Sequence, residues 1–112
     1  MRIAVPVSGG RLSPHFGHCE VFSVIDVDEK SRTLVKVEQM DAPPHEPGLL
    51  PRWLAERGVS VIIAGGMGGR AQALFAERGI EVVVGAPSEA PEAVAAAYLG
   101  GTLVTGENVC DH

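Results

Sequence analysis

The sequence predicts an α/β protein in which helices cover both faces of a mixed five-stranded sheet. The first 40 residues alternate between apolar and polar side chains as β-strands do, and a helix-to-strand pattern recurs after residue 50. A length of 112 residues with 46% hydrophobic content suits one core. We therefore expect one domain over residues 1–112, with residues 105–112 as a flexible tail.

The N-terminal part predicts three strands. Apolar residues alternate over 3–7, and Ser8-Gly9-Gly10 then indicates a loop. Two more strands are expected at 21–27 and 33–40, joined by the polar turn 28–32. Charged residues alternate with valines in the second of them, so we expect a hairpin with one solvated face.

The remainder repeats a helix-to-strand unit. Residues 54–63 match residues 75–84, and a looser third copy ends at Leu99-Gly100. Each copy has apolar residues at helical spacing, followed by a glycine that can take the left-handed cap conformation. β-Branched residues follow this glycine, and after the third copy they form a possible edge strand at 102–105. The two inner strands are almost wholly apolar, which is typical of central parallel strands. The order βββαβαβα is the one found in three-layer ribonuclease-H-like folds.

Composition narrows the functional classes. The net charge is −5 and the only lysines are Lys30 and Lys36, which argues against nucleic-acid binding. No apolar run approaches membrane-spanning length and no signal core is evident, so we expect no membrane contact and a cytoplasmic protein. Two cysteines do not make a disulfide framework.

All four histidines and both cysteines fall in three loop windows, at 15–19, 45 and 110–112. Imidazole and thiolate groups bind zinc, copper and metal-sulfur clusters, so these windows predict a metal or cluster site. Neighbours in extended chain face opposite ways, which favours His15 with either His18 or Cys19. A structural role for His15, and a small buried hydrophobe for Cys19, stay open.

The other windows are less specific. His45 lies on a stiff loop with three prolines in residues 41–47, where it could cover a cofactor or simply be solvated. Cys110 and His112 could reach a metal or belong to a frayed terminus. The absence of a Cys-x-x-Cys pair argues against a closed zinc site. The candidate metal ligands are His15, His18, Cys19 and His45.

A glycine-rich loop lies between a predicted buried strand and a predicted helix. Its residues, the candidate cofactor-binding set, are Gly65, Gly66, Met67, Gly68, Gly69 and Arg70. Exposed N–H groups at a helix N-terminus favour an anion, and Arg70 adds charge. The next strand ends in Gly85 rather than an acidic residue, which argues against a dinucleotide. A ligand-free turn is the other interpretation, and Met67 suits a packing role.

Catalysis is not indicated. Cys19 beside a histidine could form a nucleophile, but no substrate-pocket signature or acid-base pair accompanies it. A nuclease needs carboxylates for two metal ions, and the first strand carries none. We therefore expect a binding protein and not an enzyme.

Three segments together resemble the dinitrogenase iron-molybdenum cofactor biosynthesis family, a group of nitrogenase accessory factor-like proteins that includes the orange protein. They are residues 13–19 followed by Phe22, residues 65–71 followed by Leu74-Phe75, and residues 79–82. The resemblance covers nearly the whole chain. It implies a small ribonuclease-H-like domain that binds or carries a metal-sulfur cluster, and the family's histidine, cysteine and glycine loop fall on His15, Cys19 and Gly65 to Gly69.

The resemblance also implies a cofactor and partners. The cofactor would be an iron-molybdenum or molybdenum-copper sulfide cluster, held noncovalently in the orange protein, and the partner a metallocluster assembly or acceptor protein. We expect a monomer or weak homodimer. A metal-free interaction or regulatory module is the alternative function.

Overall fold

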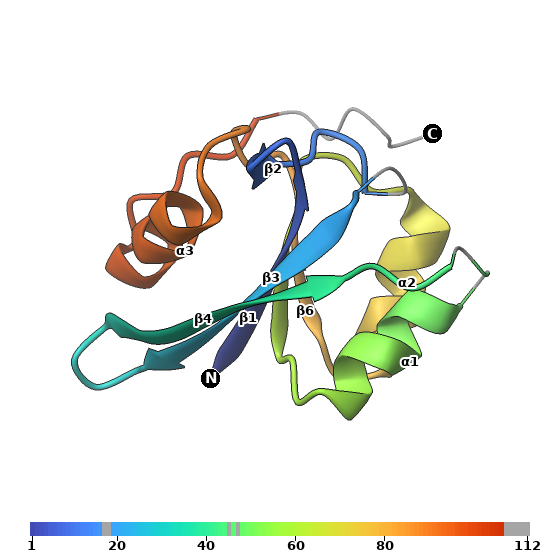
Figure 1. Cartoon of the computed structure of the whole chain (residues 1–112), viewed down its shortest axis with the longest axis horizontal. Coiled ribbons are helices and arrows are strands. Elements are labelled where there is room, and N and C mark those ends of the chain that lie inside the picture. The colour runs from blue at the N-terminus through green and yellow to red at the C-terminus, as the bar shows by residue number, and fades with distance from the viewer. Residues whose placement is uncertain (17–18, 45, 47, 107–112) are drawn as a thin grey trace.

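The structure is a computed structural model that describes residues 1–16, 19–44, 46 and 48–106 (Figure 1). Its elements, in chain order, are β1 (Arg2–Ser8), β2 (Arg11–Leu12), β3 (Val21–Asp28), β4 (Thr33–Asp41), α1 (Leu49–Glu56), β5 (Val61–Ile63), α2 (Gly69–Glu77), β6 (Glu81–Val83) and α3 (Pro91–Gly100). Apart from β2, this is the predicted order of strands and helices.

The sheet is mixed, with strand order β4-β3-β1-β5-β6. β1 is antiparallel to β3 and parallel to β5, and β5 is parallel to β6. The prediction of five strands was one short, because β2 pairs with β1 through Val7 and Leu12. Two residues are too few to produce a periodic pattern. The possible edge strand at 102–105 was wrong, because these residues lie outside any helix or strand.

Helices cover the sheet on both sides and make three layers (Figure 1). Leu54 of α1 and Phe75 of α2 pack with Phe22 and Ile62 on one face. Val94 of α3 packs on the other face. Burial on both faces explains why the inner strands are almost wholly apolar.

Glycines end the first two helices as predicted. Gly58 and Gly79 have φ of 76° and 73°, in the left-handed region that glycine reaches without strain. The third copy uses Gly101, with φ of 73°, instead of Gly100. The glycine signal therefore located all three helix ends to within two residues.

The hairpin formed by β3 and β4 differs from expectation on its outer strand. β4 is exposed along most of both faces, with Val35 68% and Val37 40% exposed, so the single solvated face was wrong. β4 is the edge of the sheet, and its contacts with α3 leave most of its length exposed. No helix in the described part of the chain is long and apolar enough to cross a membrane.

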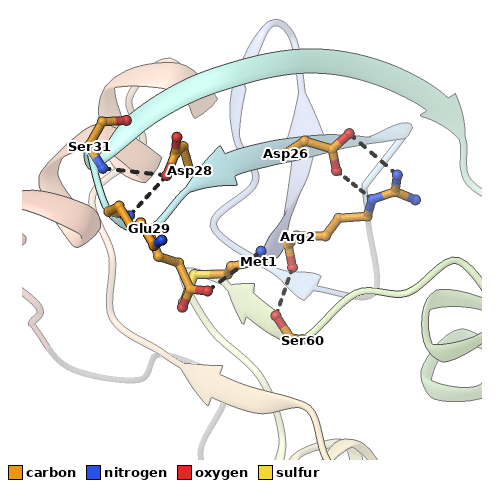
Figure 2. Close-up of polar contacts among 8 residues, drawn as sticks. Met1, Arg2, Asp26, Asp28, Glu29, Ser31 and Ser60 are labelled. Carbon is orange, nitrogen blue, oxygen red and sulfur yellow. Dashed lines mark hydrogen bonds and ion pairs between the residues drawn. The ribbon is translucent and has the colours of Figure 1, made fainter.

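The end of the sheet where β1 and β5 begin is held by polar side chains. Figure 2 shows the Arg2 guanidinium against the Asp26 carboxylate, with 2.6 Å between Nε and Oδ1. Arg2 also donates to the Arg57 carbonyl at 2.6 Å, and Ser60 donates to the Arg2 carbonyl at 3.3 Å. The hydrogen bond from Arg2 lowers the pKa of Asp26.

Candidate functional site

The candidate site lies beyond the carboxyl ends of β1 and β5. From β1 the chain runs outward through β3 and β4, and it returns on the other side of β1 as β5. Such a reversal leaves a crevice at the carboxyl ends of neighbouring parallel strands, and ligands bind there in open α/β sheets. The loop between β2 and β3 carries His15, and the loop after β5 is the glycine loop, residues 65–70.

The structure brings these two loops into direct contact. His15 forms a parallel β-bridge with Gly66, and the Phe16 amide donates to the Gly66 carbonyl at 2.9 Å. The buried Ser13 hydroxyl donates to the His15 carbonyl at 2.9 Å and fixes the loop locally. The His15 side chain itself is exposed. Two segments that are distant in the sequence therefore form one surface.

Gly65 explains how the loops approach so closely. A Cβ at this position would lie 3.0 Å from the Pro14 Cα and 3.1 Å from the Ser13 and Pro14 carbonyl oxygens. Those are backbone atoms, which yield less readily than a flexible side chain. A side chain at position 65 would therefore require the two loops to move apart by a few tenths of an ångström.

The glycine loop is held on its other side by the turn after β6. The Gly85 amide donates to the Gly65 carbonyl at 2.6 Å, and the Gly106 amide donates to the Gly85 carbonyl at 2.7 Å. Gly85 has φ of 79°, so the turn depends on glycine as well. Backbone hydrogen bonds thus connect the His15 loop, the glycine loop, the turn after β6 and Gly106.

Phe16 anchors the His15 loop in the core. Its ring lies edge-on to Phe75 at 5.5 Å between centroids, and 6.3 Å from Phe22. Phe22 in turn lies 5.8 Å from the ring of Trp53. Aromatic pairs at such distances add to the burial energy of the rings. Packing of Phe16 therefore fixes the backbone that presents the neighbouring His15.

The glycine loop leads into the N-terminus of α2. Gly68 is the N-cap residue and makes no side-chain capping bond, and the first turn of a helix has amides without intrahelical acceptors. Gly69 and Arg70 are exposed there. Met67 is 1% exposed, so its side chain belongs to the core while its carbonyl accepts from Gln72 at 2.9 Å. The exposed end of α2 thus offers positive charge.

A cavity of about 260 Å³ opens beside this helix end. Its walls come from α1, α2 and the His15 loop, and its lining residues are Phe16, Glu46, Gly48, Leu50, Pro51, Arg70, Ala71 and Leu74. Arg70 and Glu46 are the charged groups among them. The cavity was not predicted, because its walls are brought together only by folding. The indication of this cavity that the sequence offered was an apolar residue, Phe16, in an otherwise polar loop.

Cys19 is half-buried and packs against the core on the α1 and α2 side of the sheet. Burial raises the pKa of its thiol to about 11, because the thiolate is poorly solvated there. As a ligand, Cys19 would have to lose a strongly held proton to the incoming metal.

The remaining predicted ligands, His18 and His45, lie outside the described residues, as do Cys110 and His112. Within the described ranges, no group of three or more His, Cys, Asp or Glu side chains could hold a metal ion. A bare zinc ion needs three or four protein ligands.

Comparison with known proteins finds relatives over most of the chain. The model of the dinitrogenase iron-molybdenum cofactor family matches residues 1–101. An uncharacterised protein of Methanocaldococcus jannaschii, MJ0580, is 31% identical over 85 residues, which cover 73% of this chain and 72% of that protein.

Two solved structures share the fold. The protein PH0822 has a TM-score of 0.87 and 30% identity, with 96% of each chain covered. The apo form of the orange protein from Desulfovibrio gigas has a TM-score of 0.74 and 25% identity, with 96% of this chain and 93% of that chain covered. The chain belongs to the dinitrogenase iron-molybdenum cofactor family.

Proposed function

We propose that this protein binds a metal-sulfur cluster as cargo and transfers it to, or receives it from, a metallocluster assembly or acceptor protein. The observation that carries the proposal is the contact between His15 and Gly66. It places the loop with the candidate metal ligand against the loop with the candidate anion site. Family membership and the likeness to the orange protein support the same class of cargo.

Each part of the site would meet a different part of such a cluster. Metal-sulfur clusters combine metal ions, which accept an imidazole nitrogen, with sulfides, which accept hydrogen bonds. His15 would supply the imidazole, and the amides at the start of α2 would donate to sulfide. Arg70, on the same helix end and exposed, would offset negative charge. These roles are binding roles, and none of them requires turnover.

The cluster's own sulfur explains how a site with few protein ligands can retain metal. The described residues fit a preassembled anion better than a bare ion, because three grouped donors are not found among them. Noncovalent retention also suits a carrier, since cargo held by few bonds can be released to an acceptor.

The test is anaerobic reconstitution in three arms: iron with sulfide, tetrathiomolybdate with copper, and zinc alone. We expect a visible chromophore and bound metal in at least one of the first two arms and little zinc in the third. His15→Ala should lose most of the bound cluster. Arg70→Gln should weaken retention, whereas Arg78→Gln, at the opposite end of α2, is the matched control and should not.

Retention of the cluster by His15→Ala at the wild-type metal ratio would contradict the role of His15. Absence of uptake by the wild-type protein in every arm would contradict the function itself. That result would favour the metal-free interaction module.

A further inference from the structure

We propose that the open edge of β4 pairs with the β4 edge of a second copy of this chain, in an antiparallel ladder centred on Val37. β4 pairs with β3 on one side and is the last strand of the sheet on the other. An edge strand presents a row of backbone N–H and C=O groups that can pair with another strand. The inference is independent of the proposed cluster binding.

β4 is only partly protected as an edge. It spans nine residues, Thr33–Asp41, which is long for an edge strand, and it is exposed along most of its length. Val35 and Val37 are two of the four exposed large hydrophobic residues in the described chain, at 68% and 40%. Proteins commonly protect edges by short strands, covering segments, charged side chains or bulges. Of these, β4 has a bulge at Val35 and the charged Lys36 and Glu38, whereas its length and exposure leave the edge at Val37 accessible.

The charge pattern of β4 makes it complementary to itself. With a two-fold axis at Val37, Val37 lies opposite its own copy, and Lys36 lies opposite Glu38 of the second copy. The same pair recurs on the other side of the axis. Opposite charges on directly facing residues stabilise antiparallel strands, and an isologous contact of this kind closes as a dimer.

Neighbouring registers lack this complementarity. Centring the ladder on Glu38 would place two Glu38 carboxylates face to face, which is destabilising. Toward the other end, the β3–β4 ladder shifts between Asp26 and Val27, so that Val35 is an extra residue in β4. The bulge ends the regular edge there. The ladder that two copies can form is therefore short and comprises Lys36 to Glu38 and the residues beside them. A ladder of this length predicts weak, reversible association.

The test is sedimentation equilibrium of the full chain over a concentration series. We expect the wild-type average mass to rise from 11.7 kDa toward twice that value at high concentration. Lys36→Glu and Glu38→Lys should each raise the dissociation constant about tenfold or more, because like charges then face each other twice. An equimolar mixture of the two variants should associate again, since each then supplies the charge that the other lacks.

Two controls separate edge pairing from net charge and folding. Lys30→Glu in the exposed hairpin turn makes the same charge change as Lys36→Glu and should leave the association unchanged. Lys36 and Glu38 also influence Asp26 and Arg2 within the chain, so thermal melts must show each variant folded.

The proposal would be overturned by a wild-type protein that stays monomeric at the highest concentration, by single variants that associate as wild type does, or by a mixture that stays monomeric. A Lys30→Glu variant weakened as much as Lys36→Glu would overturn it as well.

Discussion

The two ends of the central sheet are held together in different ways. At the end where β1 and β5 begin, ionised and polar side chains make the contacts, as Arg2 does with Asp26 and with the Arg57 carbonyl. At the carboxyl end, backbone meets backbone, as Phe16 does with Gly66 and Gly85 does with Gly65. One end uses its charged groups internally, and the other keeps His15 and Arg70 exposed.

This difference shows how a small domain separates stability from binding. A side chain that holds a fold together cannot also change partners freely, because a broken buried contact is costly. Glycine allows close packing without committing a side chain. The carboxyl end therefore gains rigidity from its backbone, which is the preorganisation that a binding site needs.

The largest expected effect concerns Cys19, which lies in the loop that enters β3 at the carboxyl end. In a Cys110→Ser background, alkylation of the native protein at pH 8 should be about a hundredfold slower than that of the urea-unfolded protein. The reason is that burial raises the thiol pKa from 9.0 to about 11. Mass spectrometry over time measures both rates.

The same shift affects stability. The folded protein keeps the Cys19 proton between the unfolded and folded pKa values, so stability should fall as pH rises from about 9 through about 11. Equal alkylation rates in the native and unfolded states would show that Cys19 is an accessible thiolate, and the carboxyl end would then hold a reactive ligand.

Gly65→Ala tests the backbone contact itself. The added Cβ would meet the Pro14 and Ser13 backbone at 3.0 to 3.1 Å, so we expect a loss of about 1–3 kcal/mol in the free energy of unfolding. Gly69→Ala is the matched control, because nothing lies within 4 Å of its added Cβ. Urea unfolding measures both. Equal stabilities would mean that the two loops separate at little cost.

Two buried serines, one at the carboxyl end and one in the middle of the sheet, sharpen the comparison. Ser13→Ala removes the hydrogen bond to the His15 carbonyl and should cost about 1 kcal/mol. Ser23 is equally buried, but its hydroxyl has no hydrogen-bond partner in the described chain, so Ser23→Ala should be neutral or slightly stabilising. Chemical denaturation of the pair checks the difference. A costlier Ser23→Ala would point to a bound water at that hydroxyl.

The smallest effect is expected at the other end of the sheet. Asp26→Asn should cost at most about 1 kcal/mol at pH 7, because each partner is 34% exposed and solvent screens the pair. Since Arg2 lowers the pKa of Asp26 from 3.8, this stabilisation is present above pH 3.8 and is lost as pH falls through the folded-state value.

Urea unfolding at pH 7 and pH 2.5 measures the Asp26 effect, with the exposed Asp41→Asn as the control. The difference between Asp26→Asn and wild type should shrink at the lower pH. An undiminished difference would show that the contact is held by something other than charge.

Local sequence patterns predicted most of the fold. Apolar alternation located β1, β3 and β4, and the glycines at 58 and 79 located two helix ends, because strand and helix periodicity and left-handed caps are properties of neighbouring residues. β2 escaped because two residues form no pattern. The ribonuclease-H-like name for this arrangement stays a prediction.

The site was predicted in its parts and not in its assembly. His15 and Gly66 were both singled out, but their contact joins residues about fifty positions apart, and periodicity carries no information on such pairs. The cavity beside Arg70 is likewise lined by residues that are far apart in the sequence, so periodicity could not predict it. His18 and His45 stay predictions as ligands, because they lie outside the described residues.

The row of rings behind the site has an optical consequence. Trp53 is the only tryptophan of the chain. Phe22 lies between Trp53 and Phe16, 5.8 Å from one ring and 6.3 Å from the other, so the indole is at most about 12 Å from the residue next to His15. A coloured cargo bound at His15 would therefore quench indole fluorescence by energy transfer. The protein thus contains its own reporter for loading and release.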